Sequence, residues 1–175
     1  MTILICIESF SSTLLDEIIE ELKIRFSQDK LNVRFLSFPS KGPFGHQLRV
    51  VEGGRIAFHP RPYHLLHMVD RMDAFLNPLN GISLMDPAFD LILVTGSQFK
   101  EALQANDEEL QRWIVEINRN FPEPEIIFWL SDKENEQHSA PVGFPPIENI
   151  LIQREHLTQI AARLYRLILQ EVEHA

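Results

Sequence analysis

Apolar runs alternate along the chain with stretches in which apolar residues recur every three or four positions. Five runs are rich in β-branched and other apolar residues without polar alternation, as expected of strands that are covered on both faces. They are Ile3 to Ile7, Val33 to Phe38, Leu91 to Thr95, Ile126 to Leu130 and Asn149 to Ile152. Each run has the length of a strand rather than of a helix, so the pattern predicts strands at these positions.

Between these runs, the helical period predicts amphipathic helices. They cover Leu15 to Phe26 after candidate N-caps at Ser11, Ser12 or Thr13, Tyr63 to Leu76 after the helix-starting pair Arg61-Pro62, Glu108 to Asn120, and Glu155 to Glu173. Strands that alternate with helices predict an α/β fold with three layers, a mostly parallel sheet and right-handed crossovers. We expect the first strand at the centre of this sheet and the strand at 33–38 on one side of it.

Two segments fit neither period. Pro39 to Pro60 contains four glycines and several prolines, and such segments in α/β folds lie at strand ends where ligands bind. We therefore expect a binding loop there. Ser131 to Pro146 is polar and then rich in proline, and we expect it to be a surface connection.

The chain has 175 residues, which fits a single domain over residues 1–175. Its formal net charge of −9 disfavours nucleic acid and anionic membranes as partners. Cys6 has no second cysteine to pair with, which favours a reducing, cytoplasmic location. Neither a signal peptide nor a membrane span is predicted, because Glu8 ends the first apolar run and no basic residue precedes it.

The turn after the first strand is the usual anion site of an open α/β sheet, because backbone N–H groups and the helix dipole converge there. Here it reads Ser9, Phe10, Ser11, Ser12 and Thr13, without glycine or lysine. A phosphate-binding loop needs glycine for close backbone approach and lysine for charge neutralisation. We therefore expect a capped structural turn at this position, and no binding of ATP or Mg2+.

The sequence resembles thymidylate kinases in several segments that follow one another in the family's order. Val33 to Pro39, followed by residues 42–49 (Gly-Pro-Phe-Gly-His-Gln-Leu-Arg), is similar to the stretch in which a strand of that family runs into Arg-Glu-Pro-Gly-Gly-Thr and then an Ile-Arg pair. Residues 59–79, with Asp70-Arg71, resemble the helix that carries the family's Ala-Asp-Arg motif, and residues 113–130 resemble its next helix and strand. The resemblance implies a P-loop kinase-like core.

The departures from that family remove its catalytic groups, since the P-loop Gly-Lys is absent at the degenerate P-loop position (Ser9 to Thr13). Thr95-Gly96-Ser97 stands where the family has Asp-Arg-Tyr, Phe38 stands in place of a Glu, and 131–146 stands where a basic lid and a helix would lie. Phosphoryl transfer relies on positioning and on charge stabilisation by such groups. The comparison implies a pseudokinase without a functional P-loop or lid.

On the acceptor side, Arg49 and Arg71 resemble the two family arginines that meet the monophosphate, and His67 lies where an aromatic ring stacks on the base. With Phe38 and Pro39 they form a candidate pocket for a nucleoside monophosphate. The alternative is that Arg71 forms an ordinary surface ion pair with Asp70, Asp73 or another acid and that Arg49 is solvated.

Two functions remain open: a non-catalytic protein that binds a nucleotide or a protein partner, and a divergent nucleotide-metabolising phosphotransferase. His64 and His67 share a helix face, but the neighbouring Arg71 disfavours a cation, and we expect no metal site. The thymidylate kinases that the sequence resembles are homodimers, and they pair through the helix that carries the Asp-Arg motif. Because the helix Tyr63 to Leu76 is apolar on more than one stripe, we expect a homodimer, the alternative being burial of this helix by the C-terminal one.

Overall fold

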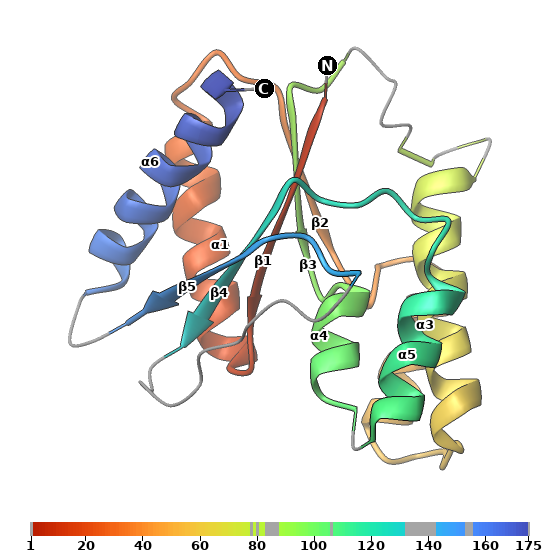
Figure 1. Cartoon of the computed structure of the whole chain (residues 1–175). Helices are drawn as coiled ribbons and strands as arrows, with labels where there is room; N and C mark the ends of the chain where they lie inside the picture. Colours follow the sequence, from red (N-terminus) through yellow and green to blue (C-terminus); the bar gives the residue numbers. More distant parts are fainter. Residues whose placement is uncertain are drawn as a thin grey trace. The chain divides into compact units, whose positions relative to one another are not determined.

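The computed structural model describes residues 2–77, 79, 81–82, 88–105, 107–131, 143–152 and 156–174 (Figure 1). Its strands are β1 (Ile3–Ser9), β2 (Val33–Ser37), β3 (Leu91–Thr95), β4 (Ile126–Ser131) and β5 (Ile147–Leu151). Its helices are α1 (Ser12–Phe26), α2 (Pro43–Glu52), α3 (Pro60–Leu76), α4 (Gln98–Leu103), α5 (Glu108–Ile117) and α6 (Leu157–His174).

Within the described residues, the strands form one five-stranded parallel sheet in the order β2-β3-β1-β4-β5. β1 pairs with β4, with Ile7 opposite Phe128, and β4 pairs with β5, with Leu130 opposite Ile150. The prediction of a parallel α/β sheet is confirmed, as are the central place of the first strand and the lateral place of the second. Five of the ten predicted strand ends coincide with the observed ones, and the other five differ by one or two residues.

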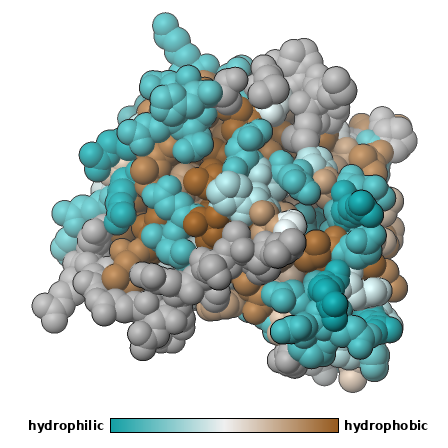
Figure 2. All heavy atoms as spheres, in the orientation of Figure 1, coloured by the Kyte–Doolittle hydropathy of each residue, from teal (hydrophilic) through white to brown (hydrophobic). Residues whose placement is uncertain are grey.

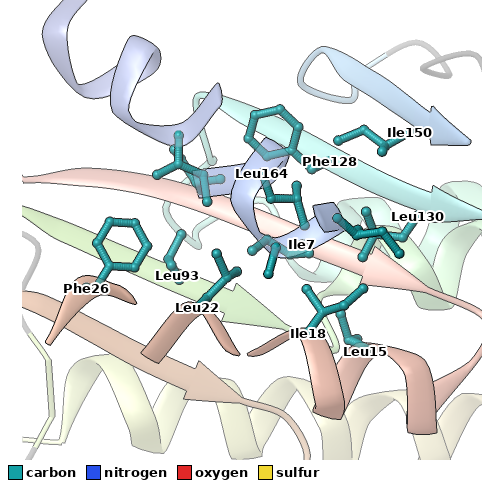
Figure 3. Packing of buried hydrophobic residues seen from close by; sticks show 14 of the residues in the cluster. Ile7, Leu15, Ile18, Leu22, Phe26, Leu93, Phe128, Leu130, Ile150 and Leu164 are labelled. Carbon is teal, nitrogen blue, oxygen red and sulfur yellow. The ribbon is translucent and has the colours of Figure 1, made fainter. Parts of the chain in front are cut away.

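The described residues cluster into two compact units, formed by residues 1–35, 87–93 and 123–175 and by residues 36–86 and 94–122. The single-domain interpretation stays a prediction. In the first unit, helices α1 and α6 lie side by side (Figure 1). Their apolar faces, at the predicted helical spacing, pack on the buried side chains of β1, β3 and β4 (Figure 3). This core includes Ile7, Leu15, Ile18, Leu22, Phe26, Leu93, Phe128, Leu130, Ile150 and Leu164.

The second unit holds α2 to α5 and is centred on aromatic side chains. The ring of Phe75 lies 6.2 Å from the ring of Phe38 and 6.5 Å from that of Phe121. Leu48 of α2 and Ile114 of α5 are fully buried. Burial of large rings contributes much of the free energy that holds short helices together.

The prediction that Pro39 to Pro60 is a loop throughout is wrong, because residues 43–52 form helix α2, and its role in binding stays a prediction. Its glycine and proline have helical explanations: Pro43 occupies the first turn, where its missing N–H costs nothing, and Gly45 packs where a Cβ would overlap the backbone of Ser40. The six-residue helix α4 had no predicted counterpart. Helix α3 begins at Pro60, three residues before the predicted start.

The predicted surface connection Ser131 to Pro146 begins at the last residue of β4, and residues 132–142 lie outside the described residues. Among the helices that the structure describes, none combines the length and the apolar character that a bilayer span requires. On the face of the molecule that Figure 2 shows, hydrophilic residues lie beside hydrophobic ones. Such a mixed surface is usual for folded proteins.

Candidate functional site

The turn between β1 and α1 is very short. Only Phe10 and Ser11 lie between the end of β1 at Ser9 and the start of α1 at Ser12. The hydroxyl of Ser11 accepts a 3.4 Å hydrogen bond from the amide of Leu14, and the amide of Ser11 donates to the hydroxyl of Ser9 at 3.1 Å. The ring of Phe10 packs edge-on against Trp129, with centroids 4.9 Å apart. The chain therefore caps this helix with its own side chains, which is the predicted capped turn.

In the second unit, the strand β2 runs into the segment Phe38-Pro39-Ser40, which is fixed at both ends. The amide of Phe38 donates a hydrogen bond to the carbonyl of Thr95 at 2.9 Å, and the Phe38–Pro39 peptide bond is cis. Gly96 has a positive φ of 73°, and a Cβ at this position would overlap the carbonyl oxygen of Phe38. Close approach of the two backbones thus requires glycine at position 96.

Ser40 is bound by the carboxylate of Asp70 on α3. Asp70 accepts hydrogen bonds from the amide of Ser40 at 2.7 Å and from its hydroxyl at 2.5 Å, and it is only 1% exposed. The hydroxyl of Ser40 also accepts from the amide of Gly42 at 3.0 Å, at the N-cap of α2. One buried carboxylate therefore holds the segment from which α2 starts.

Arg49 lies on the exposed side of α2 and reaches back over this segment. Its Nη1 donates to the carbonyl of Pro39 at 3.1 Å and to that of Ser40 at 2.5 Å. Lys41 lies in the same segment and is exposed. The same segment lies against the carboxylates of Asp70 and Asp73, so the local charge is mixed.

Arg71 has a different environment, because it is 2% exposed and paired with an acid. Its Nη1 donates to Oε1 of Glu101 on α4 at 2.5 Å, and its Nε donates to Oδ1 of Asn118 at 3.3 Å. The amide nitrogen of Asn118 in turn donates to the carbonyl of Ile114 at 2.8 Å. The Nη2 of Arg71 is buried without a hydrogen-bond partner among the described residues.

Two histidines of α3 lie beside the same carboxylate. Nδ1 of His64 is 2.8 Å from Oε2 of Glu101, and since an ionised carboxylate only accepts, His64 carries its proton on Nδ1 and donates it. Nδ1 of His67 is 3.3 Å from Oε1 of Glu101, but among the described residues neither ring nitrogen of His67 forms a hydrogen bond. The ring of His67 instead packs edge-on against Tyr63, whose hydroxyl donates to Glu52 at 3.1 Å.

The electrostatics of this cluster follow from its burial. Burial alone raises the pKa of Glu101, but the charge of Arg71 and the hydrogen bond from His64 outweigh it and lower the pKa to about 2. Burial lowers the pKa of His67 to about 4, against the opposing charge of Glu101. Burial and the adjacent Glu52 raise the pKa of Tyr63. At neutral pH, Glu101 is therefore ionised and His67 is neutral.

The residues of the predicted monophosphate pocket thus fall into two groups within one unit. Phe38 and Pro39 belong to the segment before α2, over which Arg49 of α2 reaches, while His67 and Arg71 lie beside Glu101. The predicted role of the five residues as a pocket stays a prediction. Among the described residues, no group of three or more histidine, cysteine, aspartate or glutamate side chains has an arrangement that holds a metal ion.

Sequence reasoning missed the acidic and neutral partners of this site. Glu101 lies on α4, which the hydrophobic period did not reveal, and the side chain of Asn118 lies at the end of α5. The sequence offered one signal, the alternative that Arg71 pairs with Asp70, Asp73 or another acid at the surface, and the observed pair with Glu101 is buried instead. The partner lies thirty residues further along.

No protein-family model and no curated protein matches this chain. Solved structures do. Thymidylate kinase from Candida albicans is similar with a TM-score of 0.70 and 13% identity, over 99% of this chain and 94% of that chain. Thymidylate kinase from Ehrlichia chaffeensis is similar with a TM-score of 0.64 and 10% identity, over 95% of this chain and 98% of that chain. The chain therefore has the P-loop kinase-like fold of thymidylate kinases over nearly its full length, as the sequence predicts.

Proposed function

We propose that this chain is a non-catalytic protein with the thymidylate kinase fold, a pseudokinase that acts by binding. The observation that carries the proposal is the two-residue turn, Phe10 and Ser11, between β1 and α1. A loop that wraps the phosphates of ATP needs several residues, glycine for close approach and a lysine for charge. This turn offers none of these, and its serine hydroxyls are already used as caps.

A second support comes from the end of β3. Phosphoryl transfer depends on cations and carboxylates that are positioned around the transferred group. After β3 the chain continues as Gly96 and Ser97, and Gly96 serves to bring the backbone against Phe38. The buried cation of the second unit, Arg71, is already paired with Glu101. The charges that would stabilise a transition state are thus absent or neutralised at these positions.

The partner that we propose is a second copy of the chain, bound through α3. Leu65, Met72 and Leu76 are exposed on this helix at positions i, i+7 and i+11, which places them along one stripe. The stripe carries no charge, so two acidic chains can meet there without placing like charges opposite each other. A helix of 17 residues is about 25 Å long, which is the greatest contact length that α3 can offer a second copy.

A second candidate ligand is a nucleoside monophosphate, and the exposed guanidinium of Arg49 favours it. Arg49 is held over the Pro39-Ser40 segment by two carbonyl groups that both accept from Nη1, and the residue is exposed. Lys41 adds a second exposed cation nearby in the chain. Lys41, just before α2, and Arg49, in the last turn of α2, supply positive charge that suits a phosphate monoester.

The test is an assay of phosphoryl transfer from ATP with Mg2+ to dTMP, together with thermal shifts. We expect no transfer above the uncatalysed background, while an active thymidylate kinase in the same assay shows turnover. Ligand binding raises the melting temperature according to RT ln(1 + [L]/Kd). A rise in melting temperature with dTMP and not with ATP supports a monophosphate receptor. A rise with neither nucleotide favours binding of a second copy of the chain as the function. Transfer that Arg49→Ala abolishes would overturn the proposal in favour of a divergent phosphotransferase.

A further inference from the structure

We propose that His64, His67 and Arg71 form a carboxylate-binding site on α3 that is filled by this chain's own Glu101. A small external carboxylate takes the same place when the side chain of Glu101 is shortened. The inference goes beyond the proposed function and does not rest on it. It also implies that the wild-type chain is closed to external anions at Arg71.

The residues of the proposed site and the carboxylate that fills it come from different helices. His64, His67 and Arg71 lie at i, i+3 and i+7 of α3, so they share one helix face, and Glu101 comes from α4. The two oxygens of Glu101 have different donors: Arg71 Nη1 lies 2.5 Å from Oε1, and His64 Nδ1 lies 2.8 Å from Oε2. A bound carboxylate ligand is recognised in the same way, by one directed donor for each oxygen.

Burial makes an anion necessary at this place. The side chain of Arg71 is 2% exposed and remains charged, and a buried cation without a partner is strongly unfavourable. Glu101 is also largely buried, with 10% of its side chain exposed. The cluster retains unused donor capacity, since among the described residues Nη2 of Arg71 has no hydrogen-bond partner and neither has the single N–H group of the neutral His67 ring. The site is therefore richer in donors than its present occupant can satisfy.

Chemical rescue tests this directly. Glu101→Ala removes the terminal CH2–COO⁻ group, which corresponds to one acetate ion. We expect this variant to melt well below the wild type and to regain roughly 5–10 °C at a hundredfold excess of acetate over its Kd. The rise should saturate with acetate concentration. Acetamide, which has nearly the same shape and no charge, should give no rise, and sodium chloride at equal ionic strength should not reproduce the acetate effect.

Matched variants make the outcome decisive. Glu116→Ala removes an exposed carboxylate that pairs with Arg119, and neither it nor the wild type should respond to acetate. The double variant Glu101→Ala, Arg71→Met should lose the response, because the receiving cation is gone. If Glu101→Ala does not fold in buffer, its refolding yield is compared in acetate and in acetamide, and a higher yield in acetate supports the site. A folded Glu101→Ala chain without an acetate response, or an equal response in the wild type, overturns the inference.

The experiment contains no nucleotide and no assembly step. Its failure is therefore distinguishable from a failure of the proposed function, which is read from transfer to dTMP and from nucleotide-induced shifts. Glu101→Gln gives an independent reading, because its amide fills the same volume. We expect this variant to be destabilised but not rescued by acetate, and a rescue equal to that of Glu101→Ala would contradict the inference.

Discussion

Asp70 of α3 accepts two hydrogen bonds from Ser40, which lies thirty residues earlier in the chain, through the amide at 2.7 Å and the hydroxyl at 2.5 Å. The carboxylate is almost completely buried, so these bonds replace the water that it has lost. The carbonyl of Ser40 accepts from Arg49 in turn. The segment that carries the exposed cations Lys41 and Arg49 is therefore fixed to α3 through one carboxylate.

The first prediction is that Asp70→Ala lowers the free energy of unfolding by about 2 kcal/mol, because it removes both acceptors of the partly buried amide and hydroxyl of Ser40. Urea denaturation followed by circular dichroism measures the change. Asp16→Ala, at an exposed position of α1, serves as the control and should change the free energy by less than about 0.5 kcal/mol. Equal effects of the two substitutions would contradict the role given to Asp70.

The second prediction separates backbone strain from close packing at two glycines. Gly54 and Gly96 have nearly the same positive φ, 72° and 73°. A Cβ at Gly54 has nothing within 4 Å, whereas a Cβ at Gly96 overlaps the carbonyl of Phe38. Gly54→Ala should therefore cost about 1 kcal/mol, from the left-handed conformation alone, and Gly96→Ala about 3 kcal/mol. The measurement is the free energy of unfolding of each variant. Similar losses in the two variants would show that the backbone at Phe38 moves away from the added Cβ at no cost in stability.

The three central strands of the sheet could be predicted from the sequence because they are buried on both faces. Such strands must be apolar without alternation, and β1, β3 and β4 are each almost entirely buried. Helix α1 could be predicted because its core contacts follow a helical spacing. These signals depend only on neighbouring positions, which one sequence contains.

Helix α2 and the partner of Arg71 could not be predicted for a physical reason. Gly45 looks like a loop residue, yet it is present because the backbone of Ser40 leaves no room for a Cβ. Helix α4 is too short to display a period, so Glu101 gave no helical signal. Whether Arg71 binds a ligand or an acid is decided by a residue that only the fold brings near it. Contacts between distant segments are set by tertiary structure, which local patterns do not encode.

The third prediction concerns acid stability. The pKa of His67 is about 4 in the folded chain and 6.5 as its ordinary value, because burial disfavours the imidazolium. The unfolded chain therefore takes up a proton at higher pH than the folded chain. Stability should fall as the pH is lowered from about 6.5 to about 4, by on the order of 3 kcal/mol from this group. Urea denaturation at a series of pH values measures the slope.

The control variants in that series are His67→Gln, which should lose most of the slope above pH 4.5, and His46→Gln, at an exposed position, which should keep it. The charged and titratable groups around His67 are Glu52, His64, Asp70, Arg71 and Glu101. Glu101 acts in a lower window: its folded pKa is depressed to about 2, so its contribution is complete above about 4.5 and is lost as the pH falls towards 2. An unchanged slope in His67→Gln would show that another group controls acid stability.

The fourth prediction is that the chain is a dimer that Met72→Glu or Leu76→Glu dissociates. Both side chains are exposed on α3, and a carboxylate on each would meet its symmetry mate across a twofold interface. The interface should bury about 800 Å2 per partner, as stable complexes of this kind do. Burying a carboxylate opposite a like charge costs several times the free energy that one apolar contact contributes. A single substitution to glutamate is therefore enough to dissociate the dimer. Light scattering at micromolar concentration measures the mass.

The control is Ile24→Glu on α1, where the isoleucine is 57% exposed and lies outside the proposed interface. It introduces the same charge and removes a similar apolar area, so it should leave the dimer mass unchanged. Met68→Glu provides a further variant on α3, where the side chain is half-buried and should also release monomers. If the wild-type chain already has the mass of a single copy at micromolar concentration, the exposed stripe of α3 does not pair two copies. If Ile24→Glu dissociates the dimer as fully as Met72→Glu, the interface lies elsewhere and the stripe on α3 is only exposed apolar surface.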